Sequence, residues 1–210
     1  MKDADYIKCK FIQWLLRGNA GFRRRRDMVA VEVRFSPNQR RADLLLLDDS
    51  LHAFEIKGDC DNLQKLRQQL RDYLRTFEKV SIVTTSRHLK GVRKIASYGI
   101  GLILFTGETF IVKRRPTARH RLDKLSLLTF LDRNTVKGML KRSVPAKAST
   151  YEVRKVAASQ LTYDEIRAAV QIRLRHRYKR LFRLFLRDTG GTVMPDDLAG
   201  LRGKIDGLSI

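Results

Sequence analysis

The chain of 210 residues lacks the material that several protein classes require. Its two cysteines, Cys9 and Cys60, are too few for a disulfide framework and form no C-x-x-C pair, which favours a reducing compartment. No apolar stretch approaches the ~20 residues that span a bilayer. The N-terminus shows no secretory signal, and four histidines without ligand spacing argue against structural zinc. We therefore expect a cytoplasmic protein without a membrane partner.

Acidic residues are also scarce relative to basic ones. The chain has 44 Lys and Arg against 22 Asp and Glu, a formal net charge of +22. Such a charge attracts polyanions, so nucleic acid is the first partner to consider, and anionic membranes and acidic proteins come next. The alternative explanation is that part of the charge only keeps the protein in solution. The hydrophobic fraction of 43% is enough for a substantial core.

Hydrophobic periodicity in the first half of the chain predicts an α/β core. We expect helices at 3–18, 61–78 and 87–96, and strands at 29–35, 42–47, 51–57, 80–84, 100–105 and 109–113. In the second helix, Asp61 followed by Gln64 is typical of a capping box. The order of helix, three strands, helix, strand, helix and two strands predicts a mixed sheet flanked by helices.

The second half of the chain is basic and helical. We expect a core at 1–113, a basic linker at 114–124 and a helical extension at 125–210, with helices at 125–140 and 163–187. The last helix combines a net charge of +6 with apolar positions that form a stripe and leave its arginines mostly outward. Those apolar positions are Ile166, Val170, Leu174, Leu181 and Leu184. The stripe packs on the core or forms a homodimer interface.

Three charged residues interrupt strands that otherwise look buried: Asp43, Glu55 and Lys57. An unpaired carboxylate is costly to bury, so such groups usually have a charged partner or a metal. Because alternate residues of a strand share a face, Glu55 and Lys57 project together. A hairpin through residues 48–50 brings Asp43 beside Glu55, so that two carboxylates and one ammonium converge.

Converging carboxylates repel one another unless a cation lies between them. Oxygen ligands suit Mg²⁺ or Mn²⁺, and the backbone carbonyl of Ile56 adds a further donor to Asp43 and Glu55. Such an ion activates water at a phosphodiester, and the ammonium of Lys57 stabilises the transition state. The alternative is an internal salt bridge between Lys57 and one of the two acids.

Asp43 followed by Glu55-Ile56-Lys57, within this order of elements, resembles the PD-(D/E)XK superfamily of restriction-endonuclease-like nucleases. Ala42 stands where that motif has its nominal proline. The resemblance implies metal-dependent hydrolysis of DNA, with endonuclease and exonuclease both open. It also implies a third acid, for which Glu32 is our candidate, with an ordinary strand residue as the alternative. Gln69, four residues before Tyr73, resembles the Q-x-x-x-Y element of RecB-like nucleases and is a candidate supporting residue.

A nuclease of this kind needs a basic surface that contacts phosphates. Our candidates for that surface are Arg23, Arg24, Arg25, Arg26, Arg41, Arg173, Arg177 and Arg180. The sequence leaves two other functional classes open. One is a catalytically inactive nuclease fold that only binds nucleic acid, and the other is a subunit whose tail docks on a larger complex.

Overall fold

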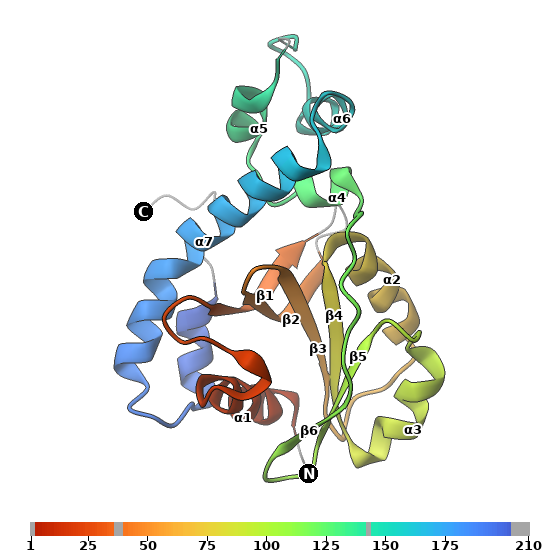
Figure 1. Cartoon of the computed structure of the whole chain (residues 1–210), viewed down its shortest axis with the longest axis vertical. Coiled ribbons are helices and arrows are strands. Elements are labelled where there is room, and N and C mark those ends of the chain that lie inside the picture. Colours follow the sequence, from red (N-terminus) through yellow and green to blue (C-terminus); the bar gives the residue numbers. More distant parts are fainter. Residues whose placement is uncertain (1–2, 36–39, 142–143, 203–210) are drawn as a thin grey trace.

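A computed structural model describes residues 3–35, 40–141 and 144–202, and it contains one mixed six-stranded sheet (Figure 1). The strands lie side by side in chain order: β1 (Met28–Phe35), β2 (Arg40–Leu47), β3 (Leu51–Lys57), β4 (Lys79–Thr85), β5 (Gly101–Phe105) and β6 (Phe110–Arg114). Neighbouring strands are antiparallel in the pairs β1–β2, β2–β3 and β5–β6 and parallel in β3–β4 and β4–β5. The predicted α/β class with a mixed sheet is confirmed.

Helices cover both faces of the sheet. They are α1 (Ala4–Leu16), followed by the short 3-10 turn η1 (Asn19–Gly21), then α2 (Leu66–Thr76) and α3 (Ser86–Ile95). In α1, Phe11 packs against Phe54 of β3 with ring centroids 5.0 Å apart. In α2, Tyr73 contacts the next residue of the same strand, Glu55. Because consecutive strand residues point to opposite faces, α1 and α2 lie on opposite sides of β3.

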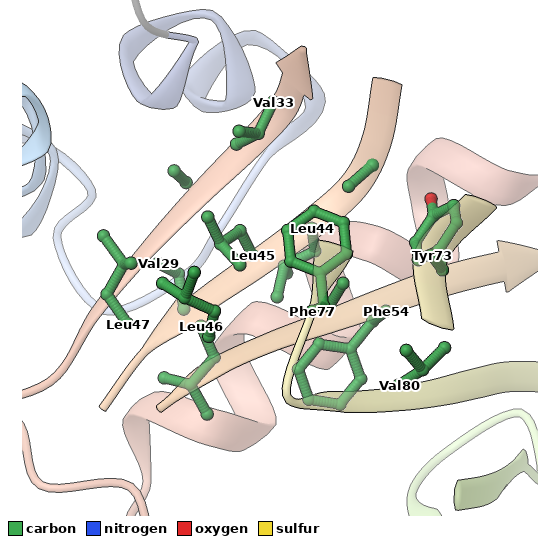
Figure 2. Close-up of a cluster of buried hydrophobic side chains, with 14 of the residues drawn as sticks. Val29, Val33, Leu44, Leu45, Leu46, Leu47, Phe54, Tyr73, Phe77 and Val80 are labelled. Atoms are coloured by element: carbon green, nitrogen blue, oxygen red, sulfur yellow. The ribbon is translucent and has the colours of Figure 1, made fainter. Parts of the chain in front are cut away.

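Apolar side chains of the first three strands form a buried cluster that also includes Tyr73 of α2 and Phe77, which follows α2. Figure 2 shows leucines and valines of β1 and β2 together with Phe54, Tyr73 and Phe77. The ring of Phe35 lies 5.0 Å from that of Tyr73 and 4.8 Å from that of Phe77, both in edge-to-face geometry. Such aromatic pairs add about 1 kcal/mol each beyond their buried area. The polar hydroxyl of Tyr73 is thereby held at a fixed place within an otherwise apolar cluster.

The second half of the chain is helical and packs back on the sheet. It comprises α4 (Lys124–Leu128), α5 (Arg133–Met139), α6 (Thr150–Gln160), α7 (Tyr163–Asp188) and the 3-10 helix η2 (Pro195–Leu201). The long α7 contacts β1, α4 and η2, and η2 also contacts α1 (Figure 1). Buried apolar side chains of both halves form one continuous cluster. No described helix is long and apolar enough to cross a membrane.

Two predicted helices differ from those observed. The helix expected at 61–78 begins at Leu66, because the carboxylate of Asp61 accepts from the backbone N–H of Gly58 (2.7 Å) instead of capping a helix. The helix expected at 125–140 is two short helices, separated where Asp132 caps α5 by accepting from the N–H of Thr135 (2.9 Å).

The apolar stripe predicted for α7 is correct only in its first half. Ile166, Val170 and Leu174 are buried, as expected, but Leu181 and Leu184 are only partly buried. From Leu174, steps of four residues reach Tyr178 and Phe182, and the aromatic residues continue the buried face to Phe185. Their larger side chains fill the space beside β1 and η1, where Phe22 lies 6.3 Å from Phe182.

Candidate active site

Asp43 of β2 and Glu55 of β3 lie opposite each other where the two strands separate. The last pair of the β2–β3 ladder is Leu44 with Phe54, so the next position of the same register places Asp43 opposite Glu55. Beyond that pair, the N–H of Ile56 donates to Oδ2 of Asp43 at 2.7 Å. The carboxylate therefore takes the place of a ladder acceptor. The N–H and C=O of one strand residue face the same neighbouring strand, so the carbonyl of Ile56 also faces Asp43.

Glu55 is almost fully buried, and both of its carboxylate oxygens have a donor. Oε1 pairs with the ammonium of Lys57 at 2.7 Å, and Oε2 accepts from the hydroxyl of Tyr73 at 2.6 Å. Burial, followed by the charges of Glu55 and Asp43, raises the pKa of Tyr73 well above its usual value. The phenol therefore remains protonated and donates. As the strand alternation predicts, Glu55 and Lys57 project to the same side of β3.

The carboxyl of Asp43 is the most perturbed acid of this cluster. Burial, followed by the charge of Glu55, raises its pKa to about 7, although the N–H of Ile56 and the ammonium groups of Lys8 and Lys57 oppose the shift. For Lys57, burial acts to lower the pKa, but the carboxylates of Glu55 and Asp43 outweigh it and raise the pKa. Asp43 and Lys57 are therefore both close enough to Glu55 to feel its charge, and the three side chains converge as the sequence predicts.

Glu32 of β1 extends this arrangement, and α1 supplies a partner that sequence reasoning missed. The β1–β2 register places Glu32 opposite Asp43, and Glu32 has a left-handed backbone (φ 53°), which is rare outside glycine. Its Oε1 pairs with the buried ammonium of Lys8 at 2.8 Å, and Lys8 also contacts Asp5 at 2.9 Å. Arg41 approaches the other oxygen of Glu32 at 3.5 Å.

A signal for Lys8 was present in the sequence. Lys8, Ile12 and Leu15 recur at the i, i+4 and i+7 spacing of the apolar stripe of α1, so Lys8 faces the core. By contrast, no described hydrogen bond or ion pair involves the side chain of Gln69. Tyr73, one helical turn later, makes the contact with Glu55, because its longer ring reaches β3 from α2.

The carboxylates of Asp43 and Glu55 could donate oxygens to a hard cation, but the number of such donors is small. Among the described residues no group of three or more His, Cys, Asp or Glu side chains is placed to hold a metal. Asp43 and Glu55 with the carbonyl of Ile56 make a smaller set, whose chemistry suits Mg²⁺ or Mn²⁺. Burial, followed by repulsion from Glu55, raises the pKa of Asp43, and a cation between the two carboxylates would relieve the repulsion. Asp43, Glu55 and the carbonyl of Ile56 are therefore the candidate ligands for such an ion.

The predicted phosphate-contacting arginines divide into two groups. Arg24 and Arg25, in the turn before β1, and Arg180, on the outer face of α7, are exposed and make no ion pair within the described residues. The others carry an internal contact: Arg23 and Arg26 with Asp49, Arg41 with Glu32, Arg173 with Asp132, and Arg177 with the ring of Tyr178.

The expectation that the arginines of α7 point mostly outward is wrong for part of the helix. Arg167 is half-buried and binds Glu78 (2.6 Å) and the carbonyl of Asp49 (2.7 Å). Arg175 donates to the carbonyl of Arg26 (3.1 Å). These contacts attach α7 to the loops before β1 and after β2. They reduce the number of charges available to a partner, and the exposed Lys179, Arg180 and Arg183 remain on the outer face.

Comparison of the whole chain with known proteins places it in a bacteriophage family. A family model described as "Bacteriophage P4 protein cII" matches residues 2–202. Protein cII of Enterobacteria phage P4 is 29% identical over 202 residues, which cover 92% of this chain and 75% of that protein. A solved structure of a protein of unknown function from Silicibacter pomeroyi aligns with 88% of this chain and 94% of its own, at 15% identity and a TM-score of 0.40. The chain belongs to the bacteriophage P4 protein cII family.

Proposed function

We propose that this protein is a Mg²⁺-dependent nuclease that hydrolyses phosphodiester bonds in DNA. The observation that carries the proposal is the convergence of Asp43, Glu55 and Lys57 at the point where β2 and β3 separate. These residue types in this order of strands resemble the PD-(D/E)XK nucleases. The net charge of +22 supports a polyanionic substrate, because the exposed basic residues attract phosphates over the range of a Debye length.

Each residue of the cluster has a distinct role in this proposal. Asp43, Glu55 and the carbonyl of Ile56 would hold the cation, which lowers the pKa of water and neutralises charge at the phosphate. Lys57 places its ammonium where it can stabilise the developing negative charge. Tyr73 positions Glu55 through the 2.6 Å hydrogen bond to Oε2. Glu32 is an auxiliary acid whose carboxylate is held by Lys8.

The test is a cleavage assay with the purified full-length protein. Supercoiled, linear duplex and single-stranded DNA and an RNA of the same sequence are incubated with Mg²⁺, Mn²⁺ or EDTA. We expect metal-dependent cleavage of DNA that falls at least about 100-fold in Asp43→Asn and in Lys57→Ala, because each removes charge that acts on the transition state. Topology and end-labelled products distinguish endonuclease from exonuclease activity.

Two surface variants control for the loss of charge alone. Glu108→Gln and Lys113→Ala change exposed residues of the β5–β6 hairpin and should retain full activity. Circular dichroism confirms that each variant is folded. Cleavage that survives in Asp43→Asn, or a folded wild-type protein that cleaves no substrate with either metal, would refute the proposal.

A second candidate is a nuclease-like fold that binds nucleic acid without cutting it. It is favoured by the ion pair between Lys8 and Glu32, because the ammonium of Lys8 already compensates the charge of Glu32, the third acid beside Asp43 and Glu55. It predicts salt-dependent DNA binding of equal strength with EDTA and Mg²⁺, and no cleavage under any condition. Gel-shift titrations run beside the cleavage assay separate the two candidates.

A further inference from the structure

A pocket of about 550 Å³ lies on the face of the sheet opposite the candidate active site. Its floor includes Phe54 of β3, whereas the next residue of that strand, Glu55, points to the other face. The turn η1 forms one side of the pocket, and the end of β6 with the residues that follow it forms the other (Figure 1). The volume lies within the range of small-ligand pockets, about 300–1,000 Å³. A ligand in this pocket rests on the back of the strand that carries Glu55 and Lys57.

The floor of this pocket is apolar and aromatic. Four strands contribute apolar side chains to it, namely Leu46, Phe54, Ile103 and Val112. The ring of His52 stacks on that of Phe54 with centroids 4.0 Å apart, and its Nε2 forms a 2.9 Å hydrogen bond with the hydroxyl of Ser81. Burial lowers the pKa of His52 to about 3, so this ring is uncharged near neutral pH. The floor therefore suits a flat apolar group and offers it no charge.

Two charged residues at the rim of the pocket compensate each other. Asp48 is the acid of the lining, and its carboxylate lies 3.8 Å from the ammonium of Lys79, which also lines the pocket. The same carboxylate accepts from the N–H and the hydroxyl of Ser50, both at 2.6 Å. Asp48 therefore has its donors already and leaves the other cations of the rim without a counter-ion.

Those other cations are Arg114 and Arg115. The guanidinium of Arg114 donates to the carbonyls of Ile100 (2.7 Å) and Ala96 (3.4 Å), and within the described part of the chain no carboxylate pairs with it. These contacts hold the guanidinium in place without neutralising it. Arg115 is exposed and makes no ion pair or hydrogen bond with any residue that the structure describes. An uncharged floor thus lies beside two arginines that attract an anion.

We infer that this pocket binds a small aromatic anion, whose flat body lies on the floor and whose anionic group meets Arg114 and Arg115 at the rim. Aromatic bodies suit the floor because rings gain from stacked or edge-to-face contacts with one another. Carboxylate, phosphate and sulfonate groups suit the rim because the planar fork of a guanidinium binds their oxygens in pairs. None of the residues proposed for catalysis lines the pocket, so the inference does not depend on nuclease activity.

The first test uses anilinonaphthalene sulfonate, an aromatic dye with one sulfonate group that fluoresces when it binds an apolar site. The dye is titrated into the full-length protein with EDTA in about 0.15 M chloride, which screens the exposed charges. We expect one saturable site whose dissociation constant rises about fivefold in Arg115→Gln. Lys113→Gln removes an exposed charge outside the pocket and should change it less than twofold. Phenylnaphthylamine, which lacks the sulfonate, should bind wild type and Arg115→Gln equally.

A matched pair of variants on β6 tests the apolar part of the site. Ile111 and Val112 are neighbours, and each is 41% exposed, but of the two only Val112 lines the pocket. Val112→Asp places a carboxylate beside the bound sulfonate and should weaken dye binding about tenfold or more. Ile111→Asp makes the same change on the other face and should weaken it less than twofold. Equal losses in these two variants would overturn the inference.

Competition against the bound dye identifies the anionic group of the ligand. Displacement by a nucleoside monophosphate indicates a phosphate, and displacement by naphthoate indicates a carboxylate; either result supports the pocket. Dye binding that does not saturate also contradicts the inference, as does a dye that neither small anion displaces at millimolar concentration, even if single-stranded DNA displaces it. Each of these outcomes is independent of the cleavage assay, because no metal is present.

Discussion

The raised pKa of Asp43 makes a quantitative prediction about stability and pH. In the folded protein its pKa is about 7, against the usual 3.8. The folded state therefore retains a proton that the unfolded state releases, so the contribution of Asp43 to the free energy of unfolding is largest below pH 4 and falls as pH rises toward 7. At about 1.4 kcal/mol for each pH unit between the two values, the loss reaches an upper limit of about 4 kcal/mol above pH 7.

Asp43→Asn should abolish this loss. The amide has no charge to desolvate or to repel Glu55, and its oxygen can still accept from the N–H of Ile56. Urea unfolding in EDTA at intervals between pH 5 and pH 8 should show a variant that is more stable than the wild type by up to a few kcal/mol at pH 8. The difference should shrink toward pH 5.

The diagnostic quantity is the difference in the free energy of unfolding between Asp43→Asn and the wild type, because the other acids titrate in both proteins. Glu108→Gln, at an exposed position, should follow the wild-type curve. With Mg²⁺ present, the proposed cation should stabilise the wild type at pH 8 and leave Asp43→Asn unchanged. A variant that is less stable than the wild type at pH 8, with the same slope against pH, would refute the reasoning.

Three further predictions concern single side chains. Tyr73→Phe removes the donor to Glu55 and should lower the free energy of unfolding by about 2 kcal/mol in urea titrations, since the bond is to a charged group. Lys8→Met leaves Glu32 without its buried ammonium and should cost about 3 kcal/mol in the same assay, with no loss meaning that the pair is dispensable. Cys60 is exposed and should react with one equivalent of a thiol reagent under native conditions, because burial raises the pKa of the other thiol to about 11.

Local rules were sufficient to predict the centre of the candidate site. Strand alternation places Glu55 and Lys57 on one side of β3, and a tight turn at residues 48–50 fixes the register that brings Asp43 opposite Glu55. Both follow from residues close in sequence. The burial of Glu55 and the partial burial of Asp43 also follow, because each interrupts an apolar run.

Contacts between distant elements could not be predicted in the same way. The pair between Lys8 and Glu32 joins α1 to β1, and the left-handed backbone of Glu32 has no signature in its residue type. The arginines of α7 likewise make contacts with distant elements that the sequence does not predict. A basic residue on an amphipathic helix is assumed to face solvent, yet Arg167 reaches Glu78, 89 positions away, because burial of that acid beside β3 requires a partner.

Glu32, Asp43 and Glu55 lie opposite one another on three neighbouring strands, and their charge balance depends on the protonation of Asp43. The nuclease and the DNA-binding module are expected to respond to that protonation in opposite ways. Lys8 and Lys57 compensate two of the three carboxylates, so the third charge is removed either by a proton on Asp43 or by a bound cation. A cation must displace that proton, so the affinity of a nuclease for its metal should rise as pH passes through about 7. A module that only binds DNA has the opposite dependence, because a protonated Asp43 repels phosphate less. The sign of the pH dependence near neutrality therefore separates catalysis from simple binding without any knowledge of the preferred substrate.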